Sequence, residues 1–156
     1  MKIVVIAVGN RMPKWVQTAV DEYSKRFPPE LKLEFREIAP QRRDGRGSEI
    51  KAMEKEGKAI LEAIPKKSYV IALDERGRQF TSEELSKKVG SWESMGCDIA
   101  LLIGGPNGLT DECRQRASEL WSLSKLTLPH PLVRVFVAET VYRAYSIYAG
   151  LPYHRA

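Results

Sequence analysis

The sequence is poor in metal-binding side chains and has no long hydrophobic run. It holds two cysteines, Cys97 and Cys113, and two histidines, His130 and His154, which never fall at the spacings that zinc sites use. The longest wholly apolar run near its start covers residues 3–8, too few to cross a bilayer or to form a signal-peptide core. We therefore expect a cytoplasmic protein with no structural metal and no membrane partner.

Two common nucleotide-binding motifs are also missing. The chain contains neither a G-x-G-x-x-G fingerprint nor a G-x-x-x-x-G-K-[ST] phosphate loop. Its composition, 43% hydrophobic and 29% charged, is that of an ordinary globular protein, and 156 residues suffice for one domain. We therefore expect a single domain over residues 1–156 that is not a common dinucleotide or triphosphate fold.

The charge is mildly positive. The 25 Lys and Arg residues exceed the 20 Asp and Glu residues by five, and the excess lies in residues 1–66 and 125–156. A basic surface suits a polyanion such as RNA, although a need for solubility explains the same excess.

Apolar runs alternate with amphipathic segments, a pattern typical of an α/β domain. We predict a mostly parallel five-stranded sheet with helices on both faces. The strands are expected over 2–8, 31–38, 69–73, 98–103 and, with an ordered loop as the alternative, 121–128. The helices are expected over 13–27, 49–63, 82–94, 111–120 and 131–150.

Helix boundaries carry local signals. Pro13 and Pro131 suit the first turns of two helices, Ser48 and Thr110 are candidate N-caps, and Thr81 begins a capping box with the glutamate three residues later. Apolar residues of the first helix recur every fourth position and predict the face that packs on the sheet: Trp15, Ala19, Tyr23 and Phe27.

The last helix has two apolar sides. One side carries Val133, Val137, Ala144 and Ile147, and the other carries Val135, Phe136, Tyr142 and Tyr145. Two such sides need two partners. The second partner is either another subunit or a further element of the same domain.

A basic segment follows the second predicted strand. Residues 41–47, QRRDGRG, hold Arg42, Arg43 and Arg46 with two glycines and no apolar residue. Such a segment suits contact with an RNA backbone, and a solvated surface loop accounts for it as well.

The ends of the predicted strands are the places to search for a ligand, because open α/β sheets bind ligands beyond the carboxyl ends of their strands. Residues 104–108 include three glycines, which let a backbone approach a ligand closely. Leu73 and Asp74 end the third run, and residues 123–130 carry little charge. This surface favours an adenine and ribose held by main-chain groups over a triphosphate.

Three segments resemble the SPOUT-class RNA methyltransferases: LLIGGPNGL at 101–109, WSLSKLTLPHPLVRVFVAETVYRA at 121–144 and PYHRA at 152–156. Further similarity at 7–16 and 22–28 extends the match to nearly the whole chain. Within the class, the chain is most similar to small bacterial enzymes that methylate N3 of a pseudouridine in large-subunit ribosomal RNA.

The resemblance implies an α/β knot fold with a C-terminal trefoil knot, S-adenosylmethionine as cofactor and a homodimer. It also implies ribosomal RNA or the ribosome as partner, recognised without a separate RNA-binding domain. The cofactor-binding residues carried over by position are Leu73, Gly104, Gly105, Leu123, Ser124, Lys125, Leu126, Thr127 and Leu128.

Methyl transfer from a sulfonium needs alignment of two reactants, and the pseudouridine imide must also lose a proton. Our first candidate for the base or substrate contact is His154, flanked by Tyr153 and Arg155 in a tail that could reach the opposite subunit.

His130 is the second candidate base, although a histidine between two prolines also suits a rigid structural corner. Arg143 can meet a phosphate or pair with Glu139 on the same helix. Two rival functions remain open. One is a non-catalytic ribosome-associated RNA-binding protein of the same fold. The other is a small hydrolase using His130 with Asp74 or Glu139, although the sequence lacks a nucleophile motif for it.

Overall fold

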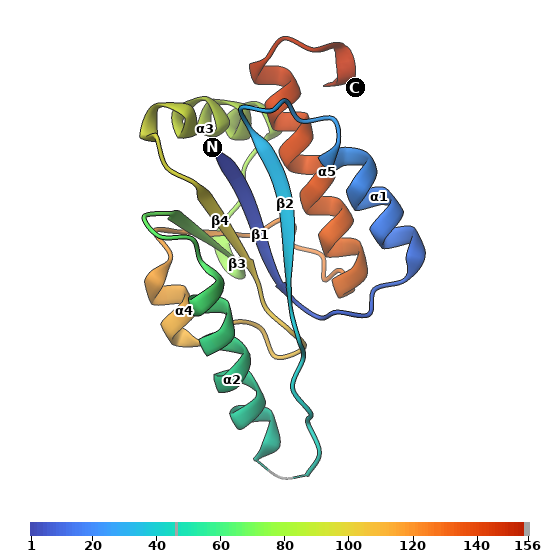
Figure 1. Ribbon diagram of the computed structural model, residues 1–156, viewed down its shortest axis with the longest axis vertical. Coiled ribbons are helices and arrows are strands. Elements are labelled where there is room, and N and C mark those ends of the chain that lie inside the picture. Colours follow the sequence, from blue (N-terminus) through green and yellow to red (C-terminus); the bar gives the residue numbers. More distant parts are fainter. Residues whose placement is uncertain (46, 155–156) are drawn as a thin grey trace.

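A five-stranded sheet between two layers of helices forms the molecule (Figure 1). The computed structural model describes residues 1–45 and 47–154. All strand pairs are parallel, and the order across the sheet is β2-β1-β4-β3-β5, which confirms the predicted five-stranded α/β sheet. The strands are β1 (Lys2–Val8), β2 (Lys32–Ile38), β3 (Tyr69–Arg78), β4 (Ile99–Ile103) and β5 (Glu119–Trp121).

The helices divide between the two faces of the sheet. The core on one face is covered by α1, α3 and α5, and the core on the other face by α2 and α4 (Figure 1). The helices are α1 (Lys14–Ser24), α2 (Ser48–Ala63), α3 (Ser82–Met95), α4 (Asp111–Arg116) and α5 (His130–Tyr148), followed by the 3₁₀ turn η1 (Pro152–His154). None of the helices among these residues is long and apolar enough to span a membrane.

The central strands explain the continuous apolar runs of the sequence. In β1, Ile3, Val5 and Ala7 belong to the core under α1, α3 and α5, whereas Val4 and Ile6 belong to the core under α2 and α4. Successive strand residues point to opposite faces, so a strand covered on both sides must be apolar at every position.

The predicted buried face of the first helix is wrong at Trp15, whose side chain is 51% exposed. The buried positions are Val16 and Val20, one residue further along. Each residue turns a helix by about 100°, so this shift moves the buried stripe to the neighbouring side. Val16 and Val20 share the four-residue spacing of Trp15 and Ala19, and spacing alone does not separate the two stripes.

The segment around the last strand also differs from the prediction. α4 ends at Arg116, four residues early, because Ala117 takes an extended conformation and the Ser118 amide donates to the Val70 carbonyl at 2.8 Å. The chain therefore enters β5 at Glu119, and residues 122–128 form a loop, the alternative to a strand. β3 extends to Arg78 with a shift in register: Leu73 and Arg78 both pair with Trp121.

Two predicted caps are confirmed and one is wrong. Thr81 and Glu84 form the capping box of α3, and the Thr110 hydroxyl accepts from the Cys113 amide. Ser48 is not an N-cap but the first residue of α2, preceded by Gly47 with a φ of +78°. Its hydroxyl donates to the Gly45 carbonyl at 2.8 Å.

α5 packs mainly within its own chain. It lies between α1 and α3, and Val137, Ala138 and Val141 are buried there. This is the arrangement in which both sides of the last helix meet elements of one domain. Leu132 and Phe136, in the first half of α5, remain exposed.

Candidate functional site

A cavity of about 650 Å³ opens beyond the carboxyl ends of β1, β3, β4 and β5. Its walls come from the ends of these strands, the turn 104–108, the loop 122–128 and the first turn of α5. The nine residues predicted to bind the cofactor all line it: Leu73, Gly104, Gly105, Leu123, Ser124, Lys125, Leu126, Thr127 and Leu128. Three segments that are separate in sequence, at Leu73, at 104–105 and at 123–128, therefore meet at one place.

The turn 104–108 is shaped by close backbone packing. The Gly108 amide donates to the Gly105 carbonyl at 3.0 Å, and Gly108 has a φ of +80°. A Cβ built on Gly104 would lie 2.6 Å from the Gly108 carbonyl oxygen, a distance that real side chains do not tolerate. Glycine at 104 thus lets the two ends of the turn touch and leaves main-chain groups at the cavity wall.

The loop 122–128 is ordered by its own serines. The Ser122 amide donates to the Arg78 carbonyl at 2.9 Å, and the Ser124 hydroxyl accepts from the Leu126 amide at 3.0 Å. These bonds replace the strand pairing that ends at Trp121. The loop is therefore held next to the cavity by one bond to the end of β3 and by a bond within the loop itself.

The cavity is mainly apolar, and two carboxylate residues, Asp74 and Glu75, lie in its wall. Asp74 lines the wall and is held by Arg76, whose backbone amide and guanidinium donate to it at 2.8–3.0 Å. These hydrogen bonds from Arg76 are the main cause that lowers the Asp74 pKa, assisted by Arg114. The carboxylate is therefore charged at neutral pH and offers an acceptor to a cationic or hydroxyl-bearing ligand.

His130 lines the same cavity, but its ring is engaged. Its Nε2 accepts a hydrogen bond from the Arg134 guanidinium at 3.0 Å. Burial lowers the His130 pKa, as does the charge of Arg134, while a hydrogen bond with the Gly104 backbone acts in the opposite direction. The imidazole is thus neutral at neutral pH, with its Nε2 lone pair occupied.

Arg134 is the residue that sequence reasoning missed. It is buried, and it donates to Glu37 Oε2 at 2.6 Å and to the Gly9 carbonyl at 2.7 Å as well as to His130. It thereby ties the ends of β1 and β2 to the start of α5. The available signal was an arginine four residues after His130 in the apolar first half of the helix.

The tail residues lie elsewhere. The hydroxyl of Tyr153 lies 2.9 Å from that of Tyr23, and its ring packs against Tyr142 and Arg143. Arg143 donates to Glu139 at 2.7 Å, which is the helix pair considered as one alternative. Burial is the main cause that raises the Tyr153 pKa, so the phenol is neutral. His154 has a buried Nδ1 that finds no hydrogen-bond partner among residues 1–45 and 47–154, and Arg155 lies outside this part of the chain.

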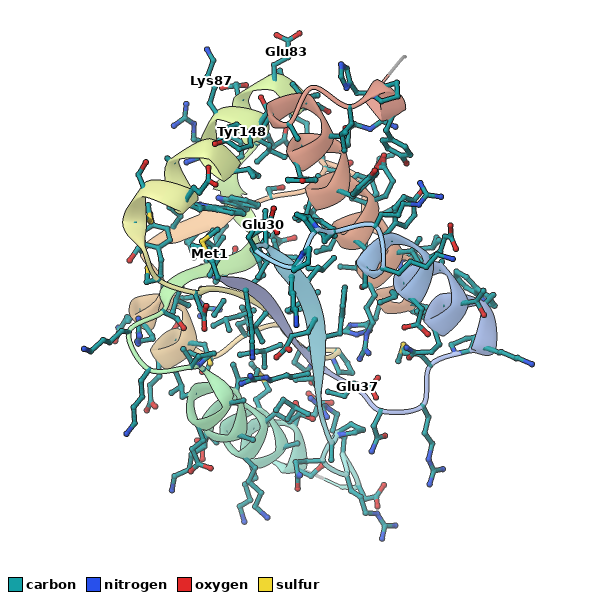
Figure 2. The ribbon with its side chains drawn as sticks, turned by 45° about the horizontal axis from the view of Figure 1, so that its top comes forward. Met1, Glu30, Glu37, Glu83, Lys87 and Tyr148 are labelled. Atoms are coloured by element: carbon teal, nitrogen blue, oxygen red, sulfur yellow. The ribbon has the colours of Figure 1, made fainter. Side chains whose placement is uncertain are left out.

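Within one chain, this tail is far from the cavity. The Tyr153 hydroxyl also reaches Glu139, which lies nine residues after His130 and therefore about 14 Å further along α5. Tyr148, near the end of α5, lies around one pocket with Met1 and Glu30, and Figure 2 shows Glu37 lower in the view than all three. The structure brings His130 to the cavity but does not bring Tyr153 or Arg143 there.

The basic segment divides into two environments. The Arg42 side chain is 92% exposed and pairs with Asp44, whereas Arg43 is only 17% exposed and pairs with the buried Glu56. The expectation of a uniformly solvated loop is therefore wrong at Arg43, and Arg46 lies outside the described residues.

A second groove, of about 550 Å³, adjoins the cavity. Arg11 and Arg42 line it together with Asn10, and it shares three wall residues with the cavity: Gly9, Met12 and Pro40. Among the residues that the structure describes, no cluster of three or more His, Cys, Asp or Glu side chains is placed to hold a metal ion.

Comparison with known proteins identifies both a family and a curated relative for this chain. Residues 1–154 match the family model described as "Predicted SPOUT methyltransferase". The chain is 54% identical over 155 residues to the ribosomal RNA large subunit methyltransferase H of Thioalkalivibrio sulfidiphilus (strain HL-EbGR7), and the match covers 99% of each chain.

Two solved structures share the fold at low identity. A probable methylase family protein from Haemophilus influenzae Rd KW20 matches 96% of this chain and 67% of its own, with 15% identity and a TM-score of 0.56. A putative methylase family protein from Neisseria gonorrhoeae matches 90% and 81%, with 16% identity and a TM-score of 0.52.

Proposed function

The chain belongs to the SPOUT methyltransferase family, and we propose that it transfers a methyl group from S-adenosylmethionine to N3 of a pseudouridine in large-subunit ribosomal RNA. The observation that carries the proposal is the cavity whose walls are formed by the turn 104–108 and the loop 122–128. The name of the 54% identical relative supports ribosomal RNA as the substrate.

The residues around the cavity fit the proposed cofactor. Its volume of about 650 Å³ lies within the range of small-molecule sites, and apolar side chains with main-chain turns suit an adenosyl group. The ionised Asp74 suits the positive charge of the cofactor. When bound, S-adenosylmethionine supplies a methyl group attached to a sulfonium sulfur. Once the methyl group is transferred, this sulfur leaves as a neutral thioether, so that the transfer needs no metal ion.

The proton on the pseudouridine imide needs an acceptor or a group that stabilises the anion. His130 is poorly suited, because its Nε2 already accepts from Arg134 and its pKa is lowered. We therefore assign substrate contact to the tail, with His154 as first candidate for the base and Tyr153, Arg155 and Arg143 as its neighbours.

A tail that is remote from its own cavity has to act in a second copy of the chain. This supports a homodimer in which the tail of one subunit completes the cavity of the other. The exposed Leu132 and Phe136 lie in the first half of α5, next to His130 and Val133 of the cavity wall. A partner packed on them would be adjacent to the site. The C-terminal trefoil knot and a cytoplasmic location are part of the same proposal.

The RNA is expected to approach along the second groove. Arg11 and Arg42 line it, and its walls continue into the cavity through shared residues. Arginines at a groove of this kind neutralise backbone phosphates, so the interaction should weaken with salt. The groove would place a backbone beside the cavity and leave one base free to enter it.

The test is methyl transfer from tritiated S-adenosylmethionine to large subunits, assembled ribosomes and free ribosomal RNA in parallel. We expect label in a single pseudouridine of the large-subunit RNA. Equilibrium dialysis with the cofactor accompanies it. Binding of ribosomes without cofactor binding or transfer would identify a non-catalytic RNA-binding protein and refute the proposal.

A further inference from the structure

A buried ion pair lies directly behind the turn 104–108. Glu56 of α2 is only 3% exposed, and its two carboxylate oxygens accept from the two terminal nitrogens of Arg43 at 2.7 and 2.8 Å. The Gln41 amide donates to the same carboxylate at 2.9 Å. A two-pronged pair of this kind fixes the plane of the guanidinium as well as its position.

The ion pair touches the turn at two points. The remaining nitrogen of Arg43, Nε, donates to the Asn107 side-chain oxygen at 2.8 Å. A Cβ built on Gly105 would lie 3.3 Å from Glu56 Oε1 and 3.5 Å from Arg43 Nη2, so the backbone of the turn rests against the pair. Arg43 therefore spans from the buried carboxylate to the turn, and its hydrogen bonds go to Glu56, Asn107 and the Gln41 carbonyl.

We propose that Arg43 is a positioning residue, which holds Asn107 and thereby keeps the turn 104–108 in the shape that forms the cofactor cavity. The inference rests on the proposed function and adds that two neighbouring arginines have different roles. Arg42 lines the groove and contacts the RNA, whereas Arg43 pairs with the buried Glu56 and supports the cofactor cavity. Pro40, three residues before Arg43, lines both spaces.

The decisive comparison is Asn107→Ala against Arg42→Ala in the full chain. Asn107 is exposed, so its truncation removes the acceptor of Arg43 and leaves the buried ion pair intact. We expect Asn107→Ala to raise the Kd for S-adenosylmethionine about three- to tenfold, as for the loss of one hydrogen bond of ordinary strength at an exposed position. Calorimetry measures this Kd, and thermal denaturation should give an unchanged melting temperature.

Steady-state methyl transfer separates the two arginines further. Asn107→Ala should raise the KM for the cofactor and leave the KM for ribosomes unchanged. Arg42→Ala should do the opposite, with a weaker salt dependence of the ribosome KM. A merely structural role of Arg43 would not produce this split.

Arg43→Lys provides the second variant. It retains the positive charge beside Glu56, but an ammonium cannot bond both carboxylate oxygens and Asn107 as the planar guanidinium does. We expect the same loss of cofactor affinity as in Asn107→Ala. The double variant should have the same Kd for the cofactor as Arg43→Lys alone, because both changes remove the same hydrogen bond between Arg43 and Asn107. Arg43→Ala is avoided, since it leaves the buried Glu56 carboxylate without its cationic partner and destabilises the fold.

The outcomes distinguish this inference from the proposed function. A wild-type protein that neither binds the cofactor nor methylates RNA refutes the function itself. A wild type that does both, with Asn107→Ala equal to it in cofactor Kd, overturns the role of Arg43 alone. Additive losses in the double variant, or an equal loss in Arg42→Ala, overturn it as well.

Discussion

Arg134 shows how a buried charge is accommodated beside a ligand cavity. An unpaired buried charge is too costly to persist, so each donor of this guanidinium needs an acceptor. Glu37, the Gly9 carbonyl and His130 supply them from three different elements. Burial, and after it the charge of Arg134, lower the pKa of the neighbouring imidazole. Arg134 thus fixes the geometry at this corner of the cavity and contributes to the protonation state of His130.

Replacing Arg134 by leucine should destabilise the protein. The change leaves the Gly9 carbonyl and His130 without their donor, but Glu37 is partly exposed and can be hydrated. We therefore expect a loss of about 2 to 3 kcal/mol in the free energy of unfolding, below the cost of stranding a fully buried partner. Urea denaturation measures it, with Arg116→Leu at an exposed position of α4 as the control. A loss no larger than the control's would contradict the interpretation.

His130 should titrate below the ordinary histidine value of 6.5, because burial and Arg134 lower its pKa. Between 6.5 and the lower folded-state pKa, the unfolded chain binds a proton that the folded protein does not. Acidification through this range therefore favours unfolding.

Proton NMR of the two histidines tests this directly, with His130→Gln to assign the signal. The wild type should also lose more stability than His130→Gln between pH 7.5 and 5.5. A His130 midpoint at or above 6.5 would show that Arg134 and burial do not control the ring.

At the scale of elements, the site depends on two turns rather than on helices or strands. The turn 104–108 is closed by glycine contacts, and the loop 122–128 by serine hydroxyls. Each follows a strand that is fixed by core packing. The strands therefore set where the turns begin, and a few local contacts set their shape.

Gly104→Ala should weaken cofactor binding by about tenfold or more, because a Cβ there meets the Gly108 backbone and the turn must open. Isothermal calorimetry with S-adenosylmethionine gives the affinity. Gly96→Ala is the matched control. Gly96, at the end of α3, has a positive φ of +67°, which Gly104 does not have, but a Cβ there meets nothing. It should cost stability without changing the affinity, and equal affinities for wild type and Gly104→Ala would exclude this turn from the site.

The sequence predicted the elements better than their contacts. The continuous apolar runs located the central strands, and the resemblance located the residues around the cavity. Arg43 was misplaced because its inward position depends on Glu56, thirteen residues later on another element. β5 and α4 were misplaced because the Ser118 amide pairs with Val70, far away in the sequence. Periodicity carries no information about such long-range partners.

At the scale of the molecule, the position of the tail decides whether one chain is sufficient. Tyr153 is anchored on α1 and α5 by Tyr23 and Glu139, away from the cavity. The proposed reaction therefore needs two chains. His154 is a better target than the whole tail, because deletion of 152–156 also removes the packing of Tyr153.

His154→Ala should lower kcat by about a hundredfold, as for a lost proton acceptor, and leave the Kd for the cofactor unchanged. At a cofactor concentration too low to load Gly104→Ala, mixing this variant with Gly104→Ala should restore activity, since each mixed dimer holds one complete site. About a quarter of the wild-type rate is expected at equal amounts after exchange of subunits. A mixture that stays as inactive as its components would show that each chain works alone.

Trp121 gives the protein a built-in optical reporter. Its ring forms part of the cavity wall and stacks on Trp92, with 6.0 Å between the ring centroids, deep in the core. A ligand entering the cavity changes the surroundings of Trp121, so the intrinsic tryptophan fluorescence of the protein should change when the cavity is occupied. Trp15 is the third tryptophan and is exposed to solvent, and replacing it by phenylalanine would remove its background fluorescence.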